Sequence, residues 1–184
     1  MRVLVITPYC PYPPERSGGV HTLFNLIKNA PKGDYDLLYY DSEDKKAESA
    51  LNKYFGKITN NCLKRRGRFL RLRSIFKRIP FAEYRYSADS WAFLDAYDIV
   101  IFDQFASLQF VYFVNSKKKI ALLHDSMPRF YSRKAKASNK FIAKVYYRLQ
   151  RKYCILSKQK YIAACNKEVY VSAEDAKYEI NNIS

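Results

Sequence analysis

Residues 2–30 read RVLVITPYCPYPPERSGGVHTLFNLIKNA, and this stretch carries the strongest signal for the fold class. Its first part, Arg2 to Thr7, is an apolar run with almost no polar alternation, which is typical of a strand covered on both faces in a parallel sheet. A loop rich in Pro and Gly follows, and apolar side chains then recur at helical spacing at Leu23, Leu26 and Ile27. The stretch therefore predicts a strand, a loop and a helix in that order.

The same alternation continues along the chain. Further strands are predicted at residues 35–40, 98–102, 119–123 and 168–171. Helices are predicted at residues 42–54 with Ser42 as a cap, from Asn139 onward, and after Ser172. Strands separated by helices form right-handed βαβ units. We therefore predict an α/β fold, a Rossmann-like open and mostly parallel sheet with helices on both faces, built as one domain over residues 1–184.

The composition narrows the class of protein. The 184 residues include no uncharged apolar stretch of about 18 residues, so no membrane span is predicted, and the short opening run does not resemble a signal peptide. The four cysteines lie far apart and form no CxxC pair, which predicts reduced thiols and no metal site. These features favour a cytoplasmic protein.

The charge is strongly positive and unevenly spread. Thirty-three Lys and Arg stand against 17 Asp and Glu, a formal net charge of +16. No acidic residue occurs in residues 49–82 or 126–167. Such a segregated positive field attracts phosphate-bearing partners, namely anionic lipid, nucleic acid or a diphosphate substrate.

Several candidate site residues follow predicted strands or begin a predicted helix. Gly18 and Gly19 stand before a helix, where free backbone N–H groups favour an anion and a ligand can approach closely, although such a pair also serves as a plain tight turn. His124 ends a strand at the edge where open parallel sheets bind ligands, with a purely structural histidine as the alternative. The same strand-end argument adds Asp125 and Asp103, for which helix capping is the alternative, and His21 is predicted to line the glycine loop.

One basic segment has the composition of a membrane-surface helix. Residues 64–78 read KRRGRFLRLRSIFKR, with eight basic residues and no acid, and a helix there places its apolar residues on one stripe. We predict contact with an anionic membrane, since cations beside an apolar stripe suit the interface, and the alternative is a surface helix with a solvated basic face. The predicted contact residues are Arg68, Phe69, Arg71, Leu72, Arg73 and Phe76.

Four motifs together resemble the N-terminal, acceptor-side domain of the GT-B glycosyltransferases of family 4. They are residues 1–30, YDIVIFDQF at 97–105, LLHDSM at 122–127 and EVYVSAEDA at 168–176, in matching order over almost the whole chain. The resemblance implies that Gly18 and Gly19 shape the acceptor side of the cleft near the donor diphosphate. It also implies a catalytic role for His124, close to the transferred sugar, and places Asp103 and Asp125 along the cleft.

The resemblance implies retaining transfer of a sugar from a nucleotide-sugar, as co-substrate, to an acceptor, commonly without a metal ion or other cofactor. The acceptors include glycans and lipid-linked acceptors at the cytoplasmic membrane face, where a peripheral protein would act. The nucleotide-binding C-terminal domain of the family is absent from this sequence, so negligible activity is expected of the chain alone. Two other readings stay open: a basic nucleic-acid- or membrane-binding module, for which no nucleic-acid motif is found, and a catalytically silent domain of the same fold.

Overall fold

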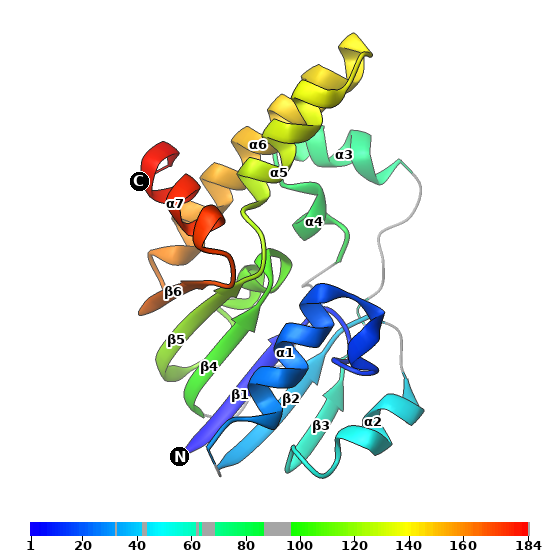
Figure 1. Cartoon of the computed structure of the whole chain (residues 1–184). Helices are drawn as coiled ribbons and strands as arrows, with labels where there is room; N and C mark the ends of the chain where they lie inside the picture. The colour runs from blue at the N-terminus through cyan, green and yellow to red at the C-terminus, as the bar shows by residue number, and fades with distance from the viewer. Residues whose placement is uncertain (32, 42–43, 62, 64–68, 87–96, 184) are drawn as a thin grey trace.

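The computed structural model describes residues 1–31, 33–41, 44–61, 63, 69–86 and 97–183 (Figure 1). Its strands are β1 (Arg2–Thr7), β2 (Asp34–Tyr39), β3 (Lys57–Asn60), β4 (Tyr97–Asp103), β5 (Ser116–Leu123) and β6 (Lys167–Tyr170). Its α-helices are α1 (Gly18–Lys28), α2 (Lys45–Leu51), α3 (Leu70–Lys77), α4 (Phe81–Tyr84), α5 (Met127–Ala137), α6 (Phe141–Ile162) and α7 (Ala173–Asn182). Two 3₁₀ helices are η1 (Pro14–Arg16) and η3 (Phe105–Phe110).

The six strands form one sheet in the order β3-β2-β1-β4-β5-β6, and every pairing between them is parallel. This confirms the predicted α/β, Rossmann-like sheet. The chain builds one half outward from β1 to β3 and then returns to β4, which pairs with the other side of β1. Between β1 and β4 the strand order therefore reverses, and open α/β sheets bind ligands at the carboxyl ends of the strands at such a point.

The two faces of the sheet bury different residues against different helices. In β1, Leu4 and Ile6 face one cluster, which η3 and α6 complete, while Val5 faces the other, which α1 and α2 complete. Neighbouring side chains of a strand point to opposite faces of the sheet, so an uninterrupted apolar run places apolar side chains on both faces, and both must be covered. The predicted cover of helices on both faces is confirmed.

Some boundaries differ from the expected ones. Helix α2 begins after Asp44, whose side chain accepts a hydrogen bond from the backbone N–H of Ala47, so Asp44 and not Ser42 is its N-cap. Ser42 lies outside the described residues. Strand β3 and helix α5 were not predicted, whereas Ser172 caps α7 as expected by accepting from the N–H of Asp175.

Helices α5 and α6 form a long hairpin. Figure 1 shows them side by side, running away from the sheet to a turn at their far end. The 22 residues of α6 give it a length of about 33 Å at 1.5 Å per residue. Helix α3 packs against α6, and α7 contacts α5. Helices α3 and α7 therefore pack against the hairpin.

Candidate functional site

The carboxyl ends of three neighbouring strands hold a buried polar triad. Asp103 ends β4 and is fully buried between Thr7 at the end of β1 and His124, which follows β5. Its Oδ1 lies 2.6 Å from Nε2 of His124, and its Oδ2 accepts a 2.8 Å hydrogen bond from the Thr7 hydroxyl. Because parallel strands end at the same edge, residues nearly 100 positions apart meet at one point.

Burial and hydrogen bonding act in opposite directions on Asp103. Loss of water raises the pKa of the carboxyl, while the hydrogen bond and charge of His124 and the hydroxyl of Thr7 lower it, and burial outweighs them. When Asp103 is ionised its carboxylate can only accept, so Nε2 of His124 then carries the proton of their contact. The buried carboxylate thereby orients the ring, and Nδ1 of His124 is left for other partners.

The two glycines before α1 play different parts. A Cβ on Gly19 would lie 3.0 Å from Oη of Tyr9, 3.2 Å from Nε2 of Gln104 and 3.7 Å from Nδ1 of His124. A Cβ on Gly18 would meet nothing within 4 Å. The close approach of the helix start to Tyr9 and Gln104 thus depends on Gly19, whereas the His124 ring lies at ordinary contact distance. This arrangement places Nδ1 of His124 beside the glycine turn.

Gln104 and Tyr9 complete this edge, and neither residue was predicted to belong to the site. Gln104 follows Asp103 with φ of 66°, a conformation that costs a non-glycine residue energy and that clusters at functional sites. Its backbone N–H donates to the carbonyl of Leu122, and its side-chain amide hydrogen-bonds the Tyr9 hydroxyl. Their positions just after β4 and β1 were the available clue.

A pocket of about 510 Å³ opens over these groups. Gly18, Gly19, His124 and Asp125 line it, together with Tyr9, Ser17, Thr22, Ala82, Gln104, Phe105, Ala106, Met127 and Val171. The strand-end prediction therefore brings both glycines, His124 and Asp125 to one pocket, with Asp103 buried behind the ring. His21 is the exception: it is exposed on α1, its Nε2 lies 2.8 Å from the amide nitrogen of Asn25, and it does not line the pocket.

A second pocket of about 460 Å³ adjoins the first and shares Tyr9, Gln104 and Met127 with it. Its lining adds three cations and one carboxylate, Arg71, Arg85, Lys134 and Asp41. The described lining of the His124 pocket holds no Lys or Arg. Positive charge therefore lies beside the His124 pocket and not within it.

No protein-family model, no curated protein and no solved structure matches this chain. Among the described residues, no three side chains of His, Cys, Asp or Glu gather in a group that could hold a metal ion.

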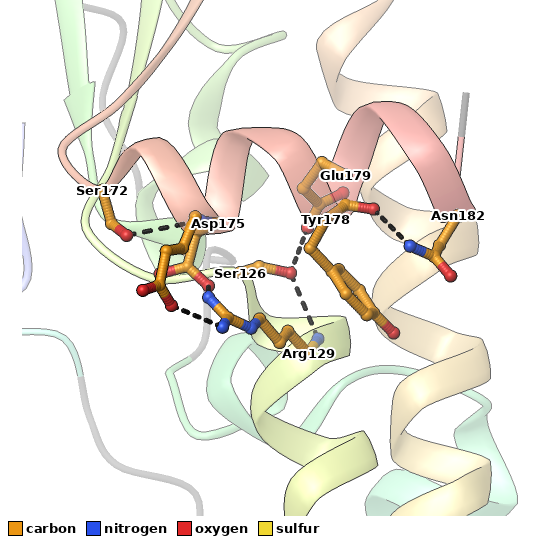
Figure 2. A network of polar contacts seen from close by, with 8 residues as sticks. Ser126, Arg129, Ser172, Asp175, Tyr178, Glu179 and Asn182 are labelled. Atoms are coloured by element: carbon orange, nitrogen blue, oxygen red, sulfur yellow. Dashed lines mark hydrogen bonds and ion pairs between the residues drawn. The ribbon is translucent and has the colours of Figure 1, made fainter.

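The loop that carries His124 is fixed from the far side by helix α7. Ser126 donates a hydrogen bond to Glu179 and accepts one from the backbone N–H of Arg129, and Figure 2 shows both contacts. The guanidinium of Arg129 donates to Asp175 at 3.0 Å. Ser126 lies two residues after His124, so this network holds the segment between the pocket and α5.

The predicted membrane-contact residues lie on or beside α3. Phe69, Arg71, Leu72, Arg73 and Phe76 are exposed, and Arg71 also lines the second pocket. Arg68 lies outside the described residues. Within the described part of the chain, none of the helices combines the length and apolar composition needed to cross a bilayer.

Proposed function

We propose that this chain is the acceptor-binding half of a retaining glycosyltransferase of the GT-B type, which transfers a sugar from a nucleotide-sugar to an acceptor. One observation carries the proposal. An imidazole, held by a buried carboxylate, presents its second nitrogen to a pocket at the switch point of a parallel sheet, beside a glycine that admits close approach. The four sequence motifs supply the reaction class.

The orientation of His124 suits an acceptor hydroxyl. Transfer breaks the bond between the anomeric carbon and the diphosphate, forms a bond to the acceptor oxygen, and passes the hydroxyl proton to the nucleoside diphosphate that leaves. In its neutral form the ring donates from Nε2 to Asp103 and accepts at Nδ1, so it can hold a hydroxyl of the acceptor or of the transferred sugar. Fixing the reacting group in this way lowers the entropic part of the barrier.

A second, nucleotide-gripping domain forms part of this proposal. The described lining of the His124 pocket supplies no Lys or Arg to balance a diphosphate. Closure of two domains over the cleft would bring that charge and exclude water. The proposal places the enzyme at the cytoplasmic membrane face, with glycan or lipid-linked acceptors.

The test is transfer of labelled sugar from a panel of UDP-, GDP- and ADP-sugars to membrane lipid and glycan extracts. The chain is assayed alone and together with the polypeptide encoded immediately after it. We expect incorporation from one class of donor in the combined sample and negligible incorporation with the chain alone. No incorporation from any donor in the combined sample contradicts the proposal.

A further inference from the structure

The far end of the α5–α6 hairpin and helix α3 together expose an unusual amount of apolar surface. Six large side chains contribute, and we call them the apolar tip: Phe69, Leu72, Phe76, Phe141, Ile142 and Val145. Phe141 and Ile142 are 79% and 83% exposed. Between α3 and α6 runs a groove of about 910 Å³, which is lined mainly by aliphatic and aromatic side chains. Apolar patches of this kind on a protein surface mark contact with another apolar phase.

The groove is held open by specific contacts between its two walls. The buried side chain of Gln150 on α6 donates to the hydroxyl of Ser74 on α3 at 3.1 Å and accepts from the backbone N–H of Phe81 at 2.7 Å. The hydroxyl of Tyr153 donates to the carbonyl of Ile75 at 3.3 Å. Because polar groups fix α3 on α6 from beneath, the apolar residues above them are presented outward as one surface.

Cations lie beside this surface on helices α5 and α6, and neither helix contains an acidic residue. Residues 126–167, which include α5 and α6, hold no Asp or Glu. A pocket of about 450 Å³ between the two helices is lined by Lys136, Lys144, Arg148 and Arg151. Within the described part of the chain no carboxylate forms an ion pair with any of these four side chains. The hairpin therefore offers anion-binding groups next to its apolar tip.

The charge selects among the possible occupants. A second copy of this chain would bring an equally basic hairpin, and like charges at an interface repel. A nucleic acid matches the cations but gains little from aliphatic Ile142, Leu72 and Val145, since its bases are bound by stacking and polar readout. An anionic bilayer fits both parts, with acyl chains for the apolar tip and phosphates for the cations.

We propose that the tip of the α5–α6 hairpin, with α3 beside it, docks this protein on a bilayer that contains anionic phospholipid. Arg71, Tyr146 and Tyr147 line both the groove and the second pocket, which in turn adjoins the His124 pocket. Docking thus turns the groove, and the two pockets that adjoin it in series, toward the headgroups. The docking does not depend on glycosyl transfer, and its test contains no sugar donor.

The first experiment measures flotation of the chain with vesicles of phosphatidylcholine, with and without phosphatidylglycerol. We expect binding only to the anionic vesicles, and a loss on the order of tenfold when Ile142→Glu puts a charge into the acyl region. Ile180→Glu is the matched control, because Ile180 is 68% exposed on α7, which lies far from the tip of the hairpin (Figure 1). The double variant Lys144→Glu with Arg148→Glu should also lose vesicle binding. The control double variant, Lys28→Glu with Lys46→Glu, has the same net charge and should retain more of the binding.

The second experiment measures depth. Ile142→Trp is introduced with Trp91→Phe, which removes the one native tryptophan, and is quenched by lipids brominated along the acyl chain. We expect the strongest quenching from bromine atoms on the part of the acyl chain nearest the headgroup. The protein could instead bind vesicles without any quenching of the tryptophan and with no loss of binding in Ile142→Glu. This result would indicate purely electrostatic adsorption and would overturn the proposal. Failure to bind anionic vesicles also overturns the proposal. The tip would then be tested for binding a second copy of the chain, by light scattering, and for binding a DNA duplex.

Discussion

Lys158→Met is expected to destabilise the fold strongly, because Lys158 neutralises two carboxylates inside the protein. Its ammonium lies 2.7 Å from Oε2 of Glu179 and 2.8 Å from Oε1 of Glu168. Lys158 is 8% exposed and Glu179 is 3% exposed. Methionine keeps the length and apolar stem of the side chain, so the substitution removes the charge with little change in packing.

The size of the effect follows from this geometry. Removing one partner of a buried ion pair costs about 3–5 kcal/mol, because the remaining charge stays out of water without a counterion. Each kcal/mol lowers the melting temperature of a chain of this size by about 2–4 °C, so we expect a drop on the order of 10 °C. Glu179 also accepts from Ser126, which caps α5, so hydrogen exchange at the N–H of Arg129 should speed up.

Urea unfolding followed by circular dichroism measures the change. Lys152→Met is the control, since Lys152 is exposed on the same helix and should change the free energy of unfolding by less than about 0.5 kcal/mol. Adding Glu179→Gln to Lys158→Met should recover part of the loss. Equal stabilities of Lys158→Met and Lys152→Met would refute the idea that this cluster holds α7 in place.

Three further predictions concern the site. Gly18→Ala should raise the free energy of unfolding by about 0.5–1 kcal/mol, because alanine favours the helix and its Cβ meets open space. Gly19→Ala should raise it less, because its Cβ would lie 3.0 Å from the Tyr9 hydroxyl. Equal gains of the two variants in urea unfolding would contradict this prediction. Asp103→Asn should convert the Nε2–H form of the His124 ring into a mixture, while His21 stays unchanged in long-range ¹H–¹⁵N spectra; a mixture already in the wild type would be the contrary result. Burial raises the pKa of Asp103 above its ordinary 3.8, so between the unfolded and folded pKa values the folded state binds more protons than the unfolded state. The wild type should therefore lose stability relative to Asp103→Asn as the pH rises through this range. A gain in the free energy of unfolding across the same range would contradict this sign.

Much of the sheet could be predicted because its central strands are buried on both faces. Runs such as Arg2–Thr7 and Tyr97–Asp103 carry apolar side chains at successive positions, and this pattern is visible without the rest of the protein. Strand β3 has only four residues, which are at most half-buried at the sheet edge, so it leaves a weak pattern. Helix α5 was missed because its 11 residues include no Leu, Ile or Val to mark an apolar stripe, and four of them are Lys or Arg.

The site was predictable only where strand position decides it. His124, Asp103 and Asp125 all follow buried runs, and the shared edge of a parallel sheet brings them together. The hydrogen bond of Thr7 and the positive φ of Gln104 depend on contacts between distant segments, which no local pattern records. His21 points away because Val20 and Leu23 set the buried face of α1, and one residue further turns about 100°.

We propose that His124 acts in sugar transfer from its place at the strand ends. The direct test compares turnover of His124→Ala and His21→Ala with the wild type in the combined transfer assay. We predict a loss of about a hundredfold or more for His124→Ala and nearly unchanged turnover for His21→Ala, whose ring lies outside the pocket. Unchanged turnover of His124→Ala would contradict the claim.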